Sequence, residues 1–426
     1  MERKWLYRVL TLAAVALVLG SLPATASHLE VQCPGDLDGD AAWNSPGETQ
    51  PPGVKCMHLA AGDGFVTMAD GQELYTFGFA DATGHPTNQV MVDYILAANF
   101  PGPTIALDEG DHFYLSLSNV GMLIRPDLFD PHSVHWHGFP QASSVFDGLP
   151  ESGIVINMGA TLVYYYNVVE PGTYMYHCHV EATEHMQMGM LANLYVRPAQ
   201  NGTVINGYSK FAYNDGDGST GYDREFPLQL SSFDGAFHIA SESVQPLPFA
   251  LMRDDYPMIN GRGYPDTLNP DPLPAPVGNG GIQSQPVSSL VEVNSGDRVL
   301  LRISNISVTR FFTLASSSLP LTVVARDAKL LRGPSGADLS YATSSVTLGG
   351  GETADVIFEA PVYTGPTGTF ATYFLYTTNL NYLNNSDEEN GGMMTEIHVY
   401  PVGDLAPQAV AGPANGRGTQ LALEIE

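Results

Sequence analysis

The chain has 426 residues, with 17 Lys and Arg against 45 Asp and Glu, so its formal net charge is −28 at neutral pH. Binding to nucleic-acid phosphates needs a basic surface, and this composition excludes one. The same excess of acid excludes attachment to an anionic membrane surface. Hydrophobic residues make up 44% of the chain, which is enough to fill folded cores, so global disorder is excluded too.

The chain begins with the features of an export signal. Basic residues among the first eight precede an apolar run over residues 9–19, and Ala24-Thr25-Ala26 offers a cleavage site between small residues. We therefore expect a signal peptide over residues 1–26 and an exported protein, either periplasmic or secreted. An uncleaved anchor is the alternative, although the run is shorter than the roughly 20 apolar residues of a membrane helix.

Residues 27–72 form an extension rich in Gly, Pro and Asp that contains Cys33 and Cys56. Export places the protein in an oxidising compartment, so we expect these two cysteines to form a disulfide. This pairing leaves Cys178, the third cysteine of the chain, as a free thiol.

The extension also carries the acidic run Asp36-Leu37-Asp38-Gly39-Asp40, whose alternating carboxylates can converge on calcium. Ala41 stands where an EF-hand loop needs its glycine, and Glu48 falls one place past the twelfth position of such a loop. A solvated acidic loop is therefore favoured, with a calcium site as the alternative.

Two runs of short alternating segments follow, over residues 73–199 and 205–400, and Gly, Pro and Asp turns separate the segments. This pattern predicts an all-β protein with two Greek-key β-sandwich domains. Residues 401–426 are expected to form a loose tail.

Segments of the first run recur in the second run. Residues 107–115 resemble residues 293–301, and residues 172–179 resemble residues 368–375. Two copies of one sandwich fold are the economical interpretation, and the second copy has lost the histidines of the first.

Six of the 12 histidines lie in two short clusters of the first run, and Cys178 lies between two of them. The first cluster consists of His132, His135 and His137, and the second of His177, His179 and His185. Two His-x-His pairs, one of them enclosing the free cysteine, predict a metal site rather than packing.

Strand periodicity divides these residues into two groups. Residues two apart on a strand share a face, so His177 and His179 share one face and Cys178 points to the other. His135 and His137 share a face in the same way, and His132 joins the opposite face if its strand continues without a bulge. One group is then His132, Cys178, His185 and a methionine, and the other is His135, His137, His177 and His179.

The first group matches the ligand set of a blue-copper electron-transfer centre, which consists of two imidazoles, a thiolate and a thioether. Zinc has no use for a weak axial thioether, so Met190 favours copper. Met186 and Met188 are rivals for this position, and ordinary core packing is the alternative for all three. The all-imidazole group suits copper that binds oxygen species, and the peptide at Cys178 offers a short covalent route for electrons between the groups.

Together, these and other motifs resemble the first cupredoxin domain of the multicopper oxidases, the laccase-like enzymes. The motifs are Asn99-Phe-Pro-Gly-Pro-Thr-Ile, Glu109-Gly-Asp, His135-Trp-His-Gly-Phe, Asp147-Gly148 and Gly172-Thr-Tyr-Met-Tyr-His-Cys-His. The second half is similar to the copper-free middle domain of that family, through Met258-Ile-Asn-Gly-Arg-Gly, Asp327 and Gly349-Gly-Gly-Glu.

The resemblance implies type 1 copper ligands and half of a trinuclear copper cluster. The implied type 1 ligands are His132, Cys178, His185 and Met190, and the implied half-cluster is His135, His137, His177 and His179. Asp147 matches an acidic residue that can donate a proton during oxygen reduction.

Two departures from the family stand out. The second type 1 histidine and the axial methionine follow the cysteine by seven and twelve residues, where the family has five and ten. The full cluster needs eight histidines, and the other six in the chain form no His-x-His pair. They are His28, His58, His85, His112, His238 and His398.

We therefore expect a copper oxidase that passes electrons from a small-molecule or metal-ion reductant to oxygen. Two copies of the first domain could contribute four histidines each across an interface, which predicts a homo-oligomer. A nitrite-reductase-like copper enzyme and a non-catalytic blue-copper or copper-binding protein are the alternatives. Glu181 and Glu184, close to His185 in the sequence, hint at a cationic reductant.

Overall fold

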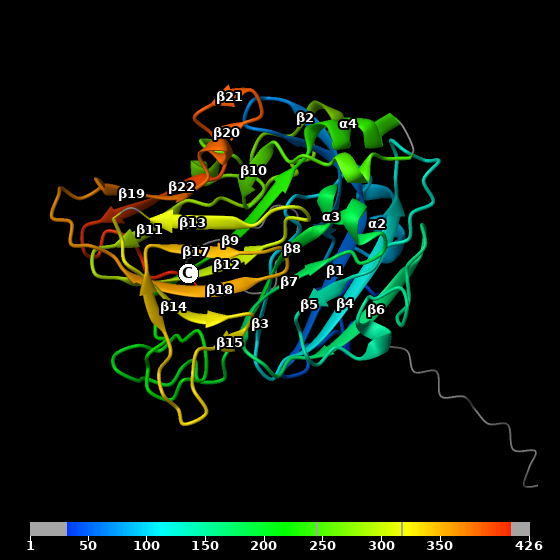
Figure 1. Cartoon of the computed structure of the whole chain (residues 1–426). Helices are drawn as coiled ribbons and strands as arrows, with labels where there is room; N and C mark the ends of the chain where they lie inside the picture. Colours follow the sequence, from blue (N-terminus) through cyan, green and yellow to red (C-terminus); the bar gives the residue numbers. More distant parts are fainter. Residues whose placement is uncertain (1–31, 244–245, 317, 410–426) are drawn as a thin grey trace, which may run out of the picture. The chain divides into compact units, whose positions relative to one another are not determined.

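The computed structural model describes residues 32–243, 246–316 and 318–409 (Figure 1). The expected signal peptide over residues 1–26 and the last part of the expected tail, residues 410–426, lie outside the described residues. Within the described ranges, no helix combines the length and the apolar character that crossing a bilayer requires.

Strands make up most of the regular structure, as the all-β prediction expects. The first half contains β1 (Val54–Thr67), β2 (Glu73–Asp81), β3 (Ile105–Asp108), β4 (His112–Gly121), β5 (His135–His137), β6 (Thr161–Asn167), β7 (Gly172–His177) and β8 (Leu191–Arg197). They form one sheet in the order β2-β1-β4-β6 and another in the order β3-β8-β7-β5. In Figure 1 these strands run from blue to green.

The second half contains two larger sheets and a small hairpin, β20-β21. The strands are β9 (Arg224–Phe233), β10 (Tyr256–Ile259), β11 (Val291–Asn294), β12 (Arg298–Asn305), β13 (Phe312–Ser316), β14 (Leu321–Arg326), β15 (Lys329–Leu330), β16 (Tyr341–Thr343), β17 (Ser345–Leu348), β18 (Thr353–Glu359), β19 (Ala371–Thr377), β20 (Asn384–Asn385), β21 (Glu388–Glu389) and β22 (Met394–Tyr400). The sheet orders are β10-β9-β12-β18-β14-β15, with β16 beside β14, and β11-β22-β19-β13-β17.

Short helices cross between the strands. They are α2 (Thr87–Asp93), α3 (Ala182–Gln187) and α4 (Gly235–Ser243), with the 3-10 turns η1 (Ser144–Phe146), η2 (Phe249–Leu251), η3 (Asp266–Leu268), η4 (Val277–Asn279) and η5 (Leu380–Tyr382). Of these, α3 lies between β7 and β8, and α4 contacts β2.

The two halves repeat one topology. β3 runs parallel to β8 and β11 runs parallel to β22, while β1 and β4 form a parallel pair that corresponds to β9 and β12. The repeated sequence segments therefore fall on equivalent strands: one pair covers the β3-β4 and β11-β12 turns, and the other lies at β7 and β19.

Each half has a large hydrophobic core of its own. Phe113, Leu115 and Leu117 on β4 point into the first core, and Val299 and Leu301 on β12 point into the second. The spacing of two follows from the alternation of strand side chains, and each buried side chain contributes roughly 1.5–3 kcal/mol.

The first sandwich begins earlier than the sequence indicated. β1 lies inside the segment assigned to the extension, yet it pairs with both β2 and β4. Residues 60–64 are Ala-Ala-Gly-Asp-Gly, which hides the strand pattern. Close packing explains this composition in part, because a Cβ atom at Gly62 would lie 2.6 Å from Val120.

The tail is not loose over its described part. Gln408 accepts a hydrogen bond from the backbone N–H of Glu225 at 2.8 Å and donates one to its carbonyl at 2.9 Å, so its side chain continues the pairing of β9. The expectation of a loose segment from Pro401 is therefore wrong for residues 401–409, because a side-chain amide can pair with a strand as a backbone does.

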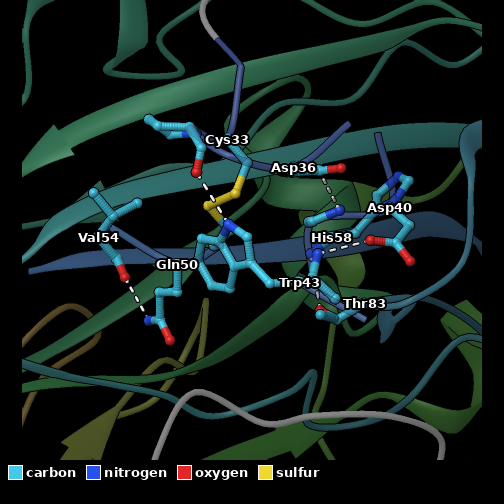
Figure 2. Close-up of a disulfide and its surroundings, with 12 residues drawn as sticks. Cys33, Asp36, Asp40, Trp43, Gln50, Val54, His58 and Thr83 are labelled. Atoms are coloured by element: carbon cyan, nitrogen blue, oxygen red, sulfur yellow. Dashed lines mark hydrogen bonds between the residues drawn. A yellow bond between two sulfur atoms is a disulfide. The ribbon is translucent and has the colours of Figure 1, made fainter. Parts of the chain in front are cut away.

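The expected disulfide between Cys33 and Cys56 is present (Figure 2). It joins the N-terminal segment to β1, and Trp43 packs against the small cluster around it. The indole of Trp43 also donates a hydrogen bond to the carbonyl of Pro34 at 3.0 Å. The disulfide therefore ties the described part of the extension to the first sandwich.

Buried charges join the two sandwiches at β7. Arg302 is fully buried, and its Nε donates a hydrogen bond to Glu225 at 2.8 Å while its Nη1 lies 3.6 Å from Asp355. Asp355 in turn accepts a hydrogen bond from the Thr173 hydroxyl on β7 at 2.5 Å. The second sandwich thus fixes the strand that leads to His177.

Removing the central cation is expected to destabilise this junction strongly. Arg302→Met leaves Asp355 buried without its counter-charge and Glu225 with Arg197 alone, at a cost of about 3–5 kcal/mol. Urea denaturation measures the loss. Arg326→Met, at a more exposed position on β14, is the control and should cost less than about 1 kcal/mol. Equal losses would contradict a buried role for Arg302.

Candidate metal centres

The structure brings His132, Cys178 and His185 together inside the first sandwich. The Cys178 Sγ lies 3.2 Å from His185 Nδ1 and 4.0 Å from His132 Nδ1, and all three side chains are fully buried. Ligand atoms bound to one metal ion at about 2 Å lie about 3–4 Å apart. These three donors are therefore spaced to hold a single ion.

Backbone hydrogen bonds close the loop that carries the group. Cys178 follows β7 directly, and its N–H donates to the carbonyl of Met190 at 3.0 Å. The N–H of Met190 donates to the carbonyl of His185 at 2.8 Å. Met190 is fully buried and lies in the same core cluster as Cys178, as does its rival Met188, whereas Met186 packs in another cluster.

A short helix lies within this loop. The residues between Cys178 and Met190 include α3, and His185 lies in its last turn. Glu181 precedes the helix with φ of 45°, a left-handed conformation that turns the chain into it.

Burial sets the protonation of this first group. It lowers the pKa of His185 to about 4 and that of His132 well below its usual value, so both imidazoles are neutral at pH 7. Burial also raises the pKa of the Cys178 thiol to about 12. Neutral imidazoles bind metal directly, whereas the thiol must release its proton when a metal binds.

The ring orientation also fits a metal group. His132 and His185 turn their Nδ1 atoms toward the Cys178 sulfur, and within the part of the chain that the structure describes neither Nε2 atom has a hydrogen-bond partner. Two imidazoles and a thiolate without a carboxylate ligand are typical of a soft or borderline metal, so the residues present fit copper.

His238 supports the ligand loop, a role that no sequence motif indicates. It lies on α4, with Nε2 3.0 Å from the carbonyl of Gln187 and Nδ1 2.6 Å from the carbonyl of Tyr75. It therefore bridges the loop and β2. An isolated histidine has no spacing signal, and only the fold brings this one to the loop.

The second group forms where β5 and β7 pair. His135 lies opposite His177 in this antiparallel pair, and His137 Nδ1 lies 3.3 Å from His177 Nε2. One nitrogen from each of these three rings lies within 4.8 Å of the other two. His135 and His137 are each half-buried and flank the fully buried Trp136, as strand alternation predicts.

His179 lies beside this group without joining its tightest part. Its ring centroid is 5.1 Å from that of His135 and 5.5 Å from that of His177. Its backbone N–H donates to Ser133 Oγ at 3.2 Å, while the N–H of Ser133 donates to Cys178 Sγ at 3.5 Å. Ser133 therefore connects the two groups through hydrogen bonds.

Hydrogen bonds also orient the rings of the second group. His135 Nδ1 lies 2.6 Å from the carbonyl oxygen of Asp147 and 3.4 Å from its carboxylate. His177 Nδ1 lies 2.8 Å from the carbonyl oxygen of Cys178. If each Nδ1–H donates its hydrogen bond to these carbonyl oxygens, the Nε2 atoms of His135 and His177 keep a lone pair that can bind a metal. Burial lowers the pKa of His135, and it lowers the pKa of His177 to about 3.

The glycine after Asp147 explains the Asp-Gly motif. Gly148 has φ of 72°, and a Cβ atom there would lie 2.2 Å from the carbonyl oxygen of Val134. The turn therefore packs directly onto the chain that leads into β5, and this contact places Asp147 beside His135.

Acidic side chains lie on the outer side of the first group. Asp130 Oδ2 is 3.9 Å from His185 Nε2, and Glu181 belongs to the same cluster of possible ligands. Asp130 is partly exposed, with 16% of its side chain accessible, whereas His185 is fully enclosed. Burial and the nearby Glu181 raise the pKa of Asp130 to about 6.

The acidic loop of the extension forms hydrogen bonds with itself. Asp36, Asp38 and Asp40 lie close together, but Asp36 accepts from the N–H groups of Gly39 and Ala41 at 2.7 and 2.9 Å. These bonds account for the loop without an ion, and the calcium alternative stays a prediction.

Comparisons with known proteins point to one family. A family profile described as Multicopper oxidase matches residues 81–201, and a second with the same description matches residues 172–400, more than half of the chain. Laccase-3 of Thanatephorus cucumeris is 24% identical over 271 residues, covering 62% of this chain and 41% of the laccase. The chain spans less than half of the length of the curated relatives it matches.

Solved structures of copper proteins share the fold of this chain. A blue copper oxidase from Nitrosomonas europaea superposes with a TM-score of 0.59 at 21% identity, covering 81% of this chain and 86% of that one. A copper nitrite reductase from the same organism gives 0.53 at 17% identity, covering 84% and 98%. The two sandwiches therefore have the fold of these cupredoxin proteins.

The metal-free protein is expected to lose stability as the pH falls from 7 to 5. Burial lowers the pKa of His58, His185 and His238 to about 4, whereas histidine in an unfolded chain titrates near 6.5. Between these values the unfolded state binds more protons, so each group costs about 2 kcal/mol of stability. Asp130 opposes the trend, because its raised pKa lets the folded state bind a proton first.

Urea denaturation of chelator-treated protein at the two pH values measures this loss. His238→Gln removes one of the buried histidines with a lowered pKa and should reduce the stability difference between pH 7 and pH 5. A stability that does not change over this range would contradict burial of the histidines in their neutral form.

Proposed function

Because the chain belongs to the multicopper oxidase family, we propose that it is a copper-dependent oxidoreductase that passes electrons from a reducing substrate to oxygen. The observation that carries the proposal is the pair of groups that meet at Cys178, one with a thiol and two imidazoles and one with imidazoles alone. We also propose the domain ranges 73–199 and 205–400, with the first sandwich extended to include β1.

We assign the proposed ligands residue by residue. His132, Cys178, His185 and Met190 would hold the electron-accepting copper, and His135, His137, His177 and His179 would hold copper at the second site. When bound, the first copper would exchange single electrons and the second would bind the oxygen species. Cys178 is bonded through its backbone to His177 and His179, so the route between the groups is short and covalent.

We propose that Asp147 delivers protons to the second group. Its carboxylate lies 3.4 Å from His135 Nδ1 and is partly exposed to solvent. Reduction of oxygen consumes protons, and a carboxyl group at the edge of the site can deliver them from solvent. Its backbone carbonyl meanwhile holds the His135 ring, so Asp147 has a positioning role as well.

Four histidines are too few for a full trinuclear cluster, so we propose that a second copy of the chain completes it. His135, His137 and His179 are partly exposed, which leaves the group accessible to a partner. Among the described residues, His58 and His238 are buried within the fold and occupied elsewhere. A symmetric interface would bring four histidines from each copy.

A nitrite-reductase-like enzyme is the second candidate, and the geometry of the three rings favours it. The donors of His135, His137 and His177 lie close enough to hold one ion, whereas His179 stands apart. One similar solved structure is named as a copper nitrite reductase, and at 17% sequence identity this likeness supports the fold alone. A blue-copper electron-transfer protein without turnover is the remaining alternative.

The reductant we propose is a cation, either a metal ion or a small organic molecule. Asp130 and Glu181 lie on the outer side of His185, where an electron would enter the first group. Carboxylates attract a cation and favour the higher charge of an oxidised metal ion. We also propose that the protein is exported, because its disulfide fits an oxidising compartment.

Single substitutions are expected to separate the two groups. Cys178→Ser should abolish the intense blue absorption of the copper-loaded protein, because that colour depends on the thiolate. His137→Ala should keep the blue colour and stop oxygen consumption. Copper per chain, the optical spectrum and an oxygen electrode measure both variants, and blue colour that survives in Cys178→Ser would refute the ligand assignment.

Neutralising the acidic pair is expected to weaken the use of a cationic reductant. The double variant Asp130→Asn, Glu181→Gln should raise KM for such a reductant by about tenfold, as a loss of about 1.4 kcal/mol implies. KM for a neutral phenol should stay unchanged, as should the blue absorption. Glu359→Gln on β18 is the control, and equal changes for cation and phenol would contradict the proposal.

A further inference from the structure

A glycine turn of the second sandwich contacts a histidine of the first. The turn is Gly349-Gly350-Gly351-Glu352, between β17 and β18, and it carries none of the proposed ligands. A Cβ atom at Gly351 would lie 2.7 Å from His137 Nε2 and 3.0 Å from its Cε1. Ordinary contact begins near 3.4 Å, so glycine leaves space here that no other residue does.

Hydrogen bonds to Asn305 hold the turn on the side away from the His137 ring. The N–H of Gly351 donates to the carbonyl of Asn305 at 2.8 Å, and the N–H of Asn305 donates to the carbonyl of Glu352 at 3.0 Å. A Cβ atom at Gly350 would lie 2.3 Å from the carbonyl oxygen of Ser307. The turn therefore packs between β12 and the imidazole with no slack on either side.

The imidazole is fixed on its other side as well. His137 Nδ1 lies 3.3 Å from His177 Nε2, while Gly351 lies at the Nε2 side of the ring. The turn lies against the Nε2 edge of the His137 ring, so the Nδ1 edge faces the other histidines. The ring therefore presents Nδ1 to the group.

The two sandwiches are joined close to this contact. The hydroxyl of Thr353, two residues after Gly351, donates to the carbonyl of Thr173 on β7 at 2.9 Å. A Cβ atom at Gly172 would lie 2.5 Å from the side chain of Ala328. The start of β18 and the start of β7 are thus locked together, which fixes the turn relative to the strand that carries His177.

We propose that Gly351 is a positioning residue, through which the ligand-free second sandwich orients His137 so that Nδ1 faces the second metal group. The inference rests on the proposed function for the meaning of that group. The steric contact itself exists without a metal, and it can be tested in metal-free protein. The Gly-Gly-Gly-Glu motif thereby gains a role that the sequence did not assign.

A double-mutant cycle on metal-free protein tests the contact. Gly351→Ala is compared with Gly296→Ala, a turn glycine of the same sandwich that also has positive φ, 83° against 91°, but has nothing within 4 Å of its Cβ position. Both variants carry the strain of a left-handed alanine, so the difference between their melting temperatures reports the clash. Gly351→Ala should lower the melting temperature further than Gly296→Ala does.

The excess should disappear in a His137→Ala background, because the ring that the new methyl group meets is then gone. An excess that persists there would overturn the inference, and so would equal effects of the two alanine variants in the wild-type background. If Gly351→Ala alone does not fold, recovery of folding in the double variant supports the inference, and failure to recover overturns it.

Copper binding supplies a readout that a general loss of packing would not move. Gly351→Ala should keep the blue absorption of the Cys178 group and lose copper affinity at the second group by about 10–100-fold, the usual cost of disturbing a group that orients a ligand. Gly296→Ala should keep both. Full copper occupancy of the second group in Gly351→Ala would overturn the inference. A wild-type protein without blue absorption would refute the proposed function, while the metal-free cycle would still decide this inference.

Discussion

The whole site depends on the end of one strand. β7 ends at His177, and the next two residues continue with Cys178 and His179. Alternating side chains send the sulfur into the first core and the imidazoles toward β5. Three consecutive residues thereby supply donors to two separate groups, and no rearrangement of loops could bring the groups closer along the chain. The other residues of both groups are positioned around the junction that these three consecutive residues form.

The protein fixes the junction from both ends. At its start, β7 meets the second sandwich through Thr173, whose hydroxyl contacts the buried Asp355 beside Arg302. At its end, backbone hydrogen bonds join Cys178 to Met190 and Met190 to His185. The second sandwich carries no histidine cluster among its described residues, but it supplies the contacts that hold the start of β7.

The residues of the first group could be picked out from the sequence because their signals are local. Cys178 stands between two histidines, and spacing alone places them on opposite faces. The all-β fold and the disulfide followed from patterns of the same short range. The start of the first sandwich was missed because β1 is rich in Ala and Gly, which pack closely but show no strand alternation. His238, Ser133 and Gly351 were missed because their roles arise from contacts between segments far apart in the chain.

The burial of Cys178 has a consequence for the protein before it meets its metal. Burial raises the pKa of this thiol to about 12, so the neutral thiol is the dominant form at pH 7. Thiolate is the form that attacks disulfides and that oxidants attack. This sulfur therefore reacts slowly with both disulfides and oxidants. In the folded chain, the free thiol of Cys178 therefore exchanges slowly with the Cys33–Cys56 bond. The same packing that shapes the site also preserves it in a reduced, usable state.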